Sequence, residues 1–252
     1  MMRVSDKIKT FKAKRKANRL KKSAFYRRYP YHGQLPLGSA DSRGLVDVEL
    51  GIFFNRIRKA GNTTIVTNLA ALKFNETRSG ADAKAAFLSP GQLDDQGVNH
   101  FGALYKFVFV RNPYTRTLSA YLDKIAKGKR KPAALVDRHG RNPSFVSFCR
   151  YLADGGLFEN GHWAPQSASL LIPADQFDFI GKLENFDADF RQVLDRITPA
   201  GSGHPVKTFE SNRTGANDRL KAYYTNEAAE IVARQVAEDF EVFGYSTVPD
   251  FL

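Results

Sequence analysis

Three short apolar segments, each followed by a helical pattern, constrain the fold of this chain more than any other feature. Residues 105–110 (YKFVFV) are dominated by aromatic and β-branched residues, which is typical of a strand buried on both faces. We predict two further strands at residues 46–57 and 177–184. Strands that alternate with helices favour a mostly parallel sheet, so the chain is predicted to be an α/β protein.

Helices are predicted after each of these strands. One ends at Phe74, one opens at Pro113, where proline suits the first helical turn, and one covers residues 185–197. A last long helix is predicted at residues 226–243, before Gly244. Residues 75–100 have weak periodicity and are predicted as loop with at most a short helix.

The positive charge of the chain is concentrated at one end. Residues 1–30 contain twelve Lys or Arg and a single acid, and so supply +11 of the formal net charge of +12. We predict a basic arm and linker at residues 1–45 and a single domain at residues 46–252. A like-charged arm is either solvated and partly helical, or attracted to an anionic lipid surface or an anionic polymer. It has no continuous apolar run of the kind that a signal peptide or a membrane span needs.

The cysteine and histidine content argues against disulfides and structural metals. Cys149 is the single cysteine, which excludes an internal disulfide and fits a reducing compartment. It lies in an apolar helical pattern, so packing is favoured over reactivity. The five histidines show no metal-ligand spacing. We therefore expect no metal, and a cytoplasmic protein whose arm is a candidate contact with the membrane.

Residues 58–64 (RKAGNTT) join the first predicted strand to its helix and have the composition of an anion-binding loop. Gly61 precedes a helix whose first amide groups can hold a phosphate oxygen. Thr63 and Thr64 add hydroxyl donors, and Lys59 enters from the strand side. The common nucleotide loop places lysine after the glycines and uses the next hydroxyl to hold Mg²⁺; that order is missing here, which suggests phosphate binding without Mg²⁺. An ordinary structural turn is the alternative.

A second anion motif follows the strand at residues 105–110. Arg111 ends this strand, and Ser119 lies eight residues on, about two helical turns away. Both can reach one anion above the start of the helix, and Arg116 is a candidate third contact. Because ligands of open parallel sheets gather at the carboxyl ends of the strands, both motifs are expected at one edge of the sheet. An exposed arginine and a serine inside a helix are the alternative.

Four segments resemble the carbohydrate sulfotransferases of the chondroitin, dermatan and HNK-1 group. The segment KFVFVRNPYTRTLSAYLDKI is similar to that family's R-[DE]-P-x-x-R-x-x-S-A-Y stretch, and RKAGNTT to its P-K-x-G-x-[TS]-[TS] loop. The segment GHWAPQSASLLIPADQFDFIGKLENFDADF resembles its H-W-x-P and D-F-[IV]-G-K-x-E elements, and EDFEVFGY its closing stretch. The membrane anchor and cysteine pairs of secretory-pathway members are missing, so a soluble, bacterial member is expected.

The resemblance implies a P-loop-NTPase-like three-layer fold and the sulfuryl donor 3′-phosphoadenosine-5′-phosphosulfate (PAPS), with a carbohydrate acceptor. It implies that Arg111 and Ser119 hold the 3′-phosphate. It assigns the 5′-phosphosulfate to the loop at residues 58–64, whose members are Arg58, Lys59, Ala60, Gly61, Asn62, Thr63 and Thr64. Two positions depart from the family pattern, since Arg58 replaces a proline and Asn112 replaces an acid.

The transfer chemistry requires a group that stabilises the leaving phosphate and a base for the acceptor hydroxyl. Lys59 suits the first role, since charge grows on the bridging oxygen as its bond to sulfur breaks. His100 is the favoured base, because the resembling family has Asn-His near this place and histidine suits proton removal near neutrality. His162 and Glu184 are the alternatives, with His162 and Trp163 also candidates for acceptor binding. Packing of Trp163 in the core, and a buried ion pair of Glu184 with Lys182, stay open.

The acceptor and two rival functions complete the expectations. Residues 127–143 hold six cations and one acid and either border a groove for an anionic glycan or form a solvated surface loop. Trp163 and Tyr114 are candidates for stacking on sugar rings, or belong to the core.

A nucleotide kinase that uses ATP with Mg²⁺ is the first rival function. A nucleic-acid-binding module led by the basic arm is the second, but specific nucleic-acid binding is not expected because the other 222 residues have a net charge of only +1.

Overall fold

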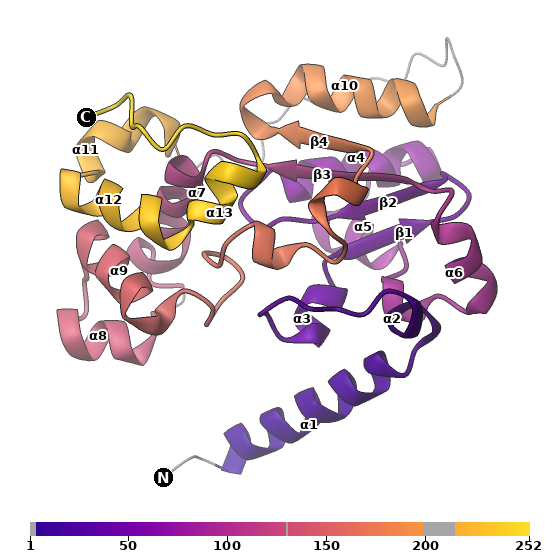
Figure 1. The fold of residues 1–252 in the computed structure, drawn as a ribbon, viewed down its shortest axis with the longest axis horizontal. Coiled ribbons are helices and arrows are strands. Elements are labelled where there is room, and N and C mark those ends of the chain that lie inside the picture. The colour runs from indigo at the N-terminus through magenta and orange to yellow at the C-terminus, as the bar shows by residue number, and fades with distance from the viewer. Residues whose placement is uncertain (1–3, 130, 199–214) are drawn as a thin grey trace.

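A four-stranded sheet forms the centre of the computed structural model, which describes residues 4–129, 131–198 and 215–252 (Figure 1). The strands are β1 (Gly44–Asp47), β2 (Ile52–Asn55), β3 (Tyr105–Val110) and β4 (Phe179–Lys182), in the order β1-β2-β3-β4. Strands β2, β3 and β4 are parallel, and β1 pairs antiparallel with β2. The predicted α/β class with a mostly parallel sheet is confirmed.

The first predicted strand was wrong in one respect, because residues 46–57 do not form a single strand. Asp47 pairs with Ile52, so β1 and β2 form a hairpin. The Asp47 carboxylate accepts a hydrogen bond from the Leu50 amide at 2.9 Å, and Gly51 takes a left-handed φ of 64°. A side-chain acceptor and a glycine with positive φ are common in tight turns, and here they reverse the chain within a segment that is otherwise apolar.

Helices cover both faces of the sheet, which makes three layers (Figure 1). On one face α4 (Asn62–Phe74), α5 (Gly80–Ala85) and α10 (Phe186–Ile197) enclose Phe54, Phe107 and Phe109. On the other face α2 (Ala24–Arg28), α3 (Leu37–Asp41) and α6 (Asp95–Phe101) pack around Phe53. Successive residues of a strand point to opposite faces, so the unbroken apolar pattern of β2 and β3 supplies both layers.

A helical region adjoins the carboxyl ends of the strands and holds a third core cluster. It contains α7 (Pro113–Ala120), α8 (Ala133–His139), α9 (Phe145–Tyr151), α11 (Leu220–Tyr223), α12 (Asn226–Gln235) and α13 (Ala237–Val242). Helices α7 and α9 continue into π-helical turns, η2 (Tyr121–Ala126) and η3 (Leu152–Gly156). The other short turns are η1 (Pro90–Gln92), η4 (Ser167–Ser169), η5 (Ala174–Gln176), η6 (Leu183–Asn185) and η7 (Asn217–Arg219). Cys149 is fully buried in this cluster, in the predicted packing role.

Two predictions for this region need correction. The last helix, predicted as one element, is broken at Val236, whose φ of −122° and ψ of 35° separate α12 from α13. The predicted surface loop at residues 127–143 contains α8, because Leu135 is fully buried and anchors a helical turn against the third cluster.

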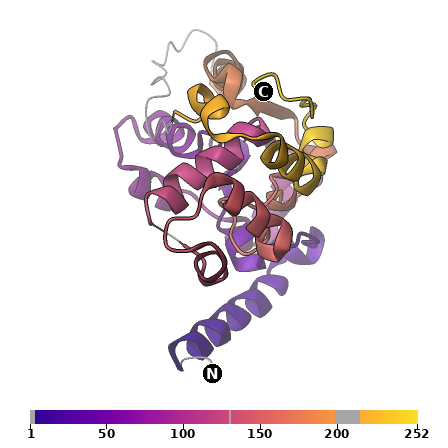
Figure 2. The same ribbon diagram turned by 90° about the vertical axis from the view of Figure 1, so that its left-hand side faces the viewer.

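The basic arm forms helix α1 (Val4–Lys21), which projects from the rest of the chain in both views (Figures 1 and 2). Packing against the sheet starts at Leu20 and continues through Phe25 and Tyr26, all of them buried. The core thus includes residues that we assigned to a linker from their composition. Among the described residues, none of the helices combines the length and the apolar character that crossing a membrane requires.

Candidate active site

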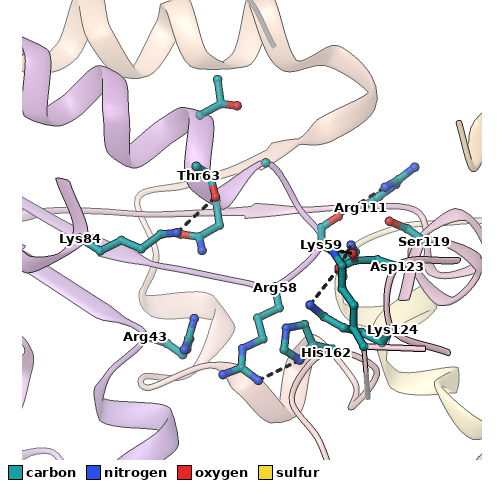
Figure 3. Close-up of a pocket in the computed structure, with 14 residues that line it drawn as sticks. Arg43, Arg58, Lys59, Thr63, Lys84, Arg111, Ser119, Asp123, Lys124 and His162 are labelled. Atoms are coloured by element: carbon teal, nitrogen blue, oxygen red, sulfur yellow. Dashed lines mark hydrogen bonds and ion pairs between the residues drawn. The ribbon is translucent and has the colours of Figure 1, made fainter. Parts of the chain in front are cut away.

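Both predicted anion motifs reach a single cavity of about 370 Å³ at the carboxyl ends of β2 and β3 (Figure 3). The loop after β2 contributes one wall, and α7 with η2 contributes the facing wall. The lining residues are Arg43, Arg58, Lys59, Gly61, Asn62, Thr63, Thr64, Lys84, Arg111, Ser119, Asp123, Lys124, Lys129 and His162. The structure therefore brings together two motifs that are about fifty residues apart in the chain.

The loop at residues 58–64 is shaped by two left-handed residues. Lys59 has φ 70° and Gly61 has φ 72°; for lysine this conformation is uncommon and costs of order 1–3 kcal/mol. The double reversal turns the chain from β2 directly into α4, whose first turn lines the cavity with Thr63 and Thr64. Amides in a first helical turn have no acceptor inside the helix, and this position suits the binding of an anion.

Arg111 is held between the two walls of the cavity. Its side chain donates to Thr115 Oγ1 at 2.9 Å and to Asn217 Oδ1 at 2.6 Å, and its Nη1 lies 3.5 Å from the Lys59 carbonyl oxygen. Burial lowers its pKa, partly offset by Glu184, yet an arginine stays protonated. A buried guanidinium fixed in this way is a preorganised anion ligand.

Helix α7 carries Ser119 into the cavity from its second turn. The helix begins at Pro113 and is capped by Asn112, whose Oδ1 accepts from the Tyr114 amide at 2.9 Å. Asparagine is a strong N-cap residue, so the departure from the family's acid at this position retains a capping function. Ser119 is only 2% exposed and lines the cavity.

Asp123 contributes a carboxylate to the cavity wall, and we did not predict it as a site residue from the sequence. Its oxygens lie 3.1 Å from Lys59 Nζ and 3.0 Å from both Lys124 Nζ and Lys129 Nζ. Burial alone would raise the pKa of Asp123, but hydrogen bonds from Lys124, Lys129 and Lys59 hold it well below its usual range. The spacing was a usable signal, because Asp123 follows Ser119 by four residues and residues four apart share a helix face.

The cavity is strongly cationic. Among the residues that the structure describes, seven Lys or Arg line it against one carboxylate, that of Asp123. Arg43 and Lys84 were not predicted, since they come from segments outside both motifs. Lys84 Nζ donates to Thr63 Oγ1 at 3.3 Å, and burial together with the charges of Arg56 and Arg43 lowers the pKa of Lys84. Cations that repel one another in a partly buried cavity are stabilised by a bound anion.

Among the histidines that the structure describes, His162 lines this cavity. Its Nδ1 lies 2.8 Å from Asn160 Oδ1 and 3.2 Å from Arg58 Nη1 (Figure 3). Arg58 thereby connects the anion loop to the segment that carries His162. Arg58 Nη1 also donates to Asn160 Oδ1 at 3.4 Å, and a proline, the family residue at position 58, has no side-chain donor for that acceptor.

His100 lies away from the cavity, so its assignment as the base was wrong. It is exposed near the end of α6, and its Nδ1 contacts the Gln96 carbonyl oxygen at 2.8 Å. Helix α6 precedes β3, so His100 lies at the amino end of that strand while Arg111 follows the carboxyl end (Figure 1). A six-residue strand spans about 20 Å at roughly 3.3 Å per residue, too far for a direct proton transfer.

Trp163 is a core residue rather than a surface for a sugar. It is 2% exposed, its Nε1 donates to the Gly156 carbonyl at 3.0 Å, and its ring meets that of Phe148 edge-on at 5.6 Å. Tyr114 is equally buried and donates to the Thr247 carbonyl. Ala60 is buried in a cluster with Val108 and does not line the cavity. For Trp163 and Tyr114, the open alternative of packing is the correct one; Ala60, predicted as a binding residue of the loop, has a side chain that packs in the core.

Arg116 and Glu184 support the site from outside the cavity. Arg116 is buried and donates to the carbonyls of Arg58 at 3.0 Å and Ala164 at 2.8 Å, which joins the anion loop to the His162 segment. Burial lowers the pKa of Arg116 to about 10. Glu184 accepts hydrogen bonds from the Asn112 amide and the Tyr245 hydroxyl at 2.8 and 2.9 Å. Neither residue faces the cavity, and Glu184 does not form the predicted pair with Lys182.

The fold and the site define an α/β protein with a cationic cavity at the carboxyl ends of its parallel strands, lined on both walls by side chains that can donate hydrogen bonds to a phosphate group. Residues 43–246 match the family model described as "Sulfotransferase family". This match spans most of the chain, and the chain therefore belongs to the sulfotransferase family.

Curated relatives agree with this assignment. The chain is 37% identical to mouse carbohydrate sulfotransferase 14 over 107 residues, which cover 37% of this chain and 28% of the relative. It is 32% identical to the zebrafish (Danio rerio) protein of the same name over 133 residues, 46% of this chain and 36% of the relative. It is 28% identical to rat carbohydrate sulfotransferase 11 over 182 residues, 62% of this chain and 51% of the relative. The matches thus span about half or less of the relatives' length. No solved structure matches the chain significantly.

Proposed function

We propose that this protein transfers a sulfuryl group from PAPS to a hydroxyl group of a carbohydrate. The observation that carries the proposal is the cavity in which the loop at residues 58–64 faces Arg111 and Ser119, with seven cations against one carboxylate. PAPS carries a phosphate at one end and a phosphosulfate at the other, and two separate donor sets on opposite walls suit such a molecule. The relatives' names supply the carbohydrate acceptor.

Each wall has its own role in binding the donor. Arg111 and Ser119 would hold the 3′-phosphate, for which the fixed guanidinium is well suited. The amides at the start of α4, with the hydroxyls of Thr63 and Thr64, would hold the 5′-phosphosulfate. Arg58 would extend this wall towards the acceptor through its contact with His162.

Lys59 would stabilise the leaving group. During transfer a bond forms between the acceptor oxygen and sulfur, while the bond between sulfur and the bridging phosphate oxygen breaks. Negative charge grows on that oxygen, and an ammonium group placed there stabilises the transition state more than the ground state. Asp123 would position Lys59 for this task through the 3.1 Å ion pair.

His162 would accept the proton of the acceptor hydroxyl. If Nδ1–H donates to Asn160 Oδ1, which lies at 2.8 Å, the imidazole keeps its lone pair on Nε2, the form that a general base requires. His162 also lies beside Arg58, on the same side of the cavity as the proposed phosphosulfate site. These positions support His162 over His100.

The nucleotide-kinase alternative requires a site for Mg²⁺ next to the phosphates. Carboxylates are the usual protein ligands of Mg²⁺, and the carboxylate that lines this cavity, Asp123, is already neutralised by three lysines. The donor set therefore suits a phosphate group better than a metal ion.

Two measurements test the proposal. Adenosine 3′,5′-bisphosphate should raise the melting temperature without added metal, and by more than ATP with Mg²⁺ does. Radiolabelled sulfate should pass from PAPS to a member of a panel of glycans and glycolipids. Lys59→Ala and Arg111→Ala should each lower this activity by at least about 10²-fold, with His100→Ala as the control variant. Full activity of both cavity variants would refute the assignment, and stabilisation by ATP with Mg²⁺ alone would favour a kinase.

A further inference from the structure

A second cleft, of about 980 Å³, lies between the end of α1 and the segment that runs from α5 to η1. Five cations line it, and they come from four separate parts of the chain: Lys16 and Arg19 on α1, Lys22 after it, Arg56 after β2, and Lys84 on α5. Helix α1 thus forms one wall of a cleft rather than only a projecting arm.

Asp41, the one acidic residue among the described residues that line this cleft, is engaged inside the protein. Asp41 is buried and accepts hydrogen bonds from Tyr26 Oη at 3.0 Å, Ser89 Oγ at 2.8 Å and the Gly91 amide at 2.7 Å. Its oxygens are therefore used to hold α2, α3 and η1 together. In the part of the chain that the structure describes, no other carboxylate lines the cleft beside its cations.

Lys84 connects the cleft to the active-site cavity, because it lines both. Arg43 stands on the cavity side of this junction and Arg56 on the cleft side. Arg56 donates to the backbone carbonyls of Ser42 and Arg43 rather than to a carboxylate. Burial, and after it the charge of Arg56, lowers the pKa of Arg43 to about 10, and burial with the charge of Arg58 does the same for Arg56. Three cations that repel one another at a junction form a site for an anionic group.

We propose that this cleft binds the chain of an anionic polysaccharide acceptor, with a carboxylate or sulfate group at the junction of Arg56 and Lys84 and further anionic sugars along Lys16 and Arg19. The inference rests on the proposed function, since it takes the reacting hydroxyl to lie in the adjoining cavity. It assigns acceptor binding to α1 and α5, whereas the charge of residues 127–143 made that segment one candidate for the role, with a solvated surface loop as the alternative.

A polysaccharide fits the shape of this site better than a lipid surface does. The cations line a concave cleft that continues into the cavity through Lys84. A membrane would instead contact the projecting helix from any side. At about 100° per residue, Lys14 and Lys21 lie on the side of α1 opposite to Lys16 and Arg19, and all four side chains are exposed. The two pairs therefore provide matched variants.

The test compares Lys16→Glu/Arg19→Glu with Lys14→Glu/Lys21→Glu, which change the net charge by the same amount. Binding of uronic-acid-containing oligosaccharides (chondroitin fragments of increasing length) is measured by calorimetry at several salt concentrations, together with KM in the sulfate-transfer assay. We expect the first variant to weaken binding and raise KM about tenfold, since each exposed ion pair contributes modestly and reversal replaces attraction by repulsion. The control variant should bind as the unmodified protein does. Affinity should increase with chain length, and its dependence on salt should be shallower in the first variant.

The outcomes separate this inference from the proposed function. Equal loss of binding in both variants would show that the oligosaccharide is attracted to the net charge of α1, and would overturn the assignment of the cleft as its binding site. If neither variant bound the oligosaccharides but both still bound fully to vesicles that contain anionic lipid, the inference would be overturned in favour of a membrane contact. Failure of the unmodified protein to bind any anionic oligosaccharide would also overturn it. Stabilisation by adenosine 3′,5′-bisphosphate is measured in parallel, and its absence would count against the proposed function instead.

Discussion

Asp123 holds three lysine side chains at the edge of the cavity, and Asp123→Asn removes its charge with almost no change in volume. In the unmodified protein Lys59 lies 3.1 Å from the carboxylate and is only 11% exposed. The variant leaves Lys59, Lys124 and Lys129 close together without the group that balances them. We therefore expect the free variant to be less stable than the unmodified protein and to be stabilised more by a bound anion.

The magnitude follows from the geometry of the Lys59–Asp123 pair. At an effective dielectric constant of about 20, unit charges 3.1 Å apart attract one another by about 5 kcal/mol. Desolvation of both groups and screening at the open edge of the cavity offset much of this energy. A net loss of about 2 kcal/mol is expected, which corresponds to a fall in Tm of about 4–8 °C for a chain of this size.

The assay is thermal unfolding with and without adenosine 3′,5′-bisphosphate. At neutral pH the free variant should melt below the unmodified protein, and the ligand should raise its Tm by more than it raises that of the unmodified protein, because the cavity carries one more net positive charge. The pH dependence adds a second readout. The pKa of Asp123 is lowered on folding, so its contribution is present above the usual aspartate value and is lost as the pH falls through the folded-state pKa. The variant should therefore lose less stability on acidification below about pH 4.

Two results would refute this reasoning. An unchanged Tm in the free variant would show that Asp123 does not hold the lysines against their mutual repulsion. A smaller ligand-induced shift in the variant would show that Asp123 assists the binding of an anion rather than competing with it.

Three further predictions concern His162 in the cavity, His100 outside it and Trp163 in the core. His162→Gln should lower kcat by about 10²- to 10⁴-fold if His162 is the base, and the fall in activity on acidification should disappear with it; an unchanged pH profile would assign the proton to another group. His100→Ala should leave kcat/KM unchanged, since His100 is exposed at the other end of β3, and a large loss would restore it as a candidate. Trp163→Ala should cost about 3–5 kcal/mol of unfolding free energy in urea, while Trp163→Phe should keep KM for the acceptor; a raised KM in the folded Phe variant would argue for direct contact with the sugar.

The local features of the sequence were sufficient for strands β3 and β4 and for the positions of both predicted anion motifs. The apolar run of β3 and the glycine before α4 are each contained within a few residues of the chain, and local propensity decides such elements. The same reasoning failed at β1 and β2, where the apolar run continues through a hairpin. Hydrogen bonds from the Leu50 amide to the Asp47 carboxylate and from the Gly51 amide to the Val48 carbonyl, together with the left-handed Gly51, make that turn.

Only the tertiary structure decided which side chains share the cavity. His100 and His162 both resembled a base in the sequence, but the direction of β3 places one of them at the wrong end of the sheet. Arg43, Lys84 and Asp123 belong to the site because three separate segments converge where parallel strands end, and Trp163 does not, because its neighbours bury it. Burial and Coulomb forces act through space between groups that the fold brings together, so separation along the chain does not reveal them.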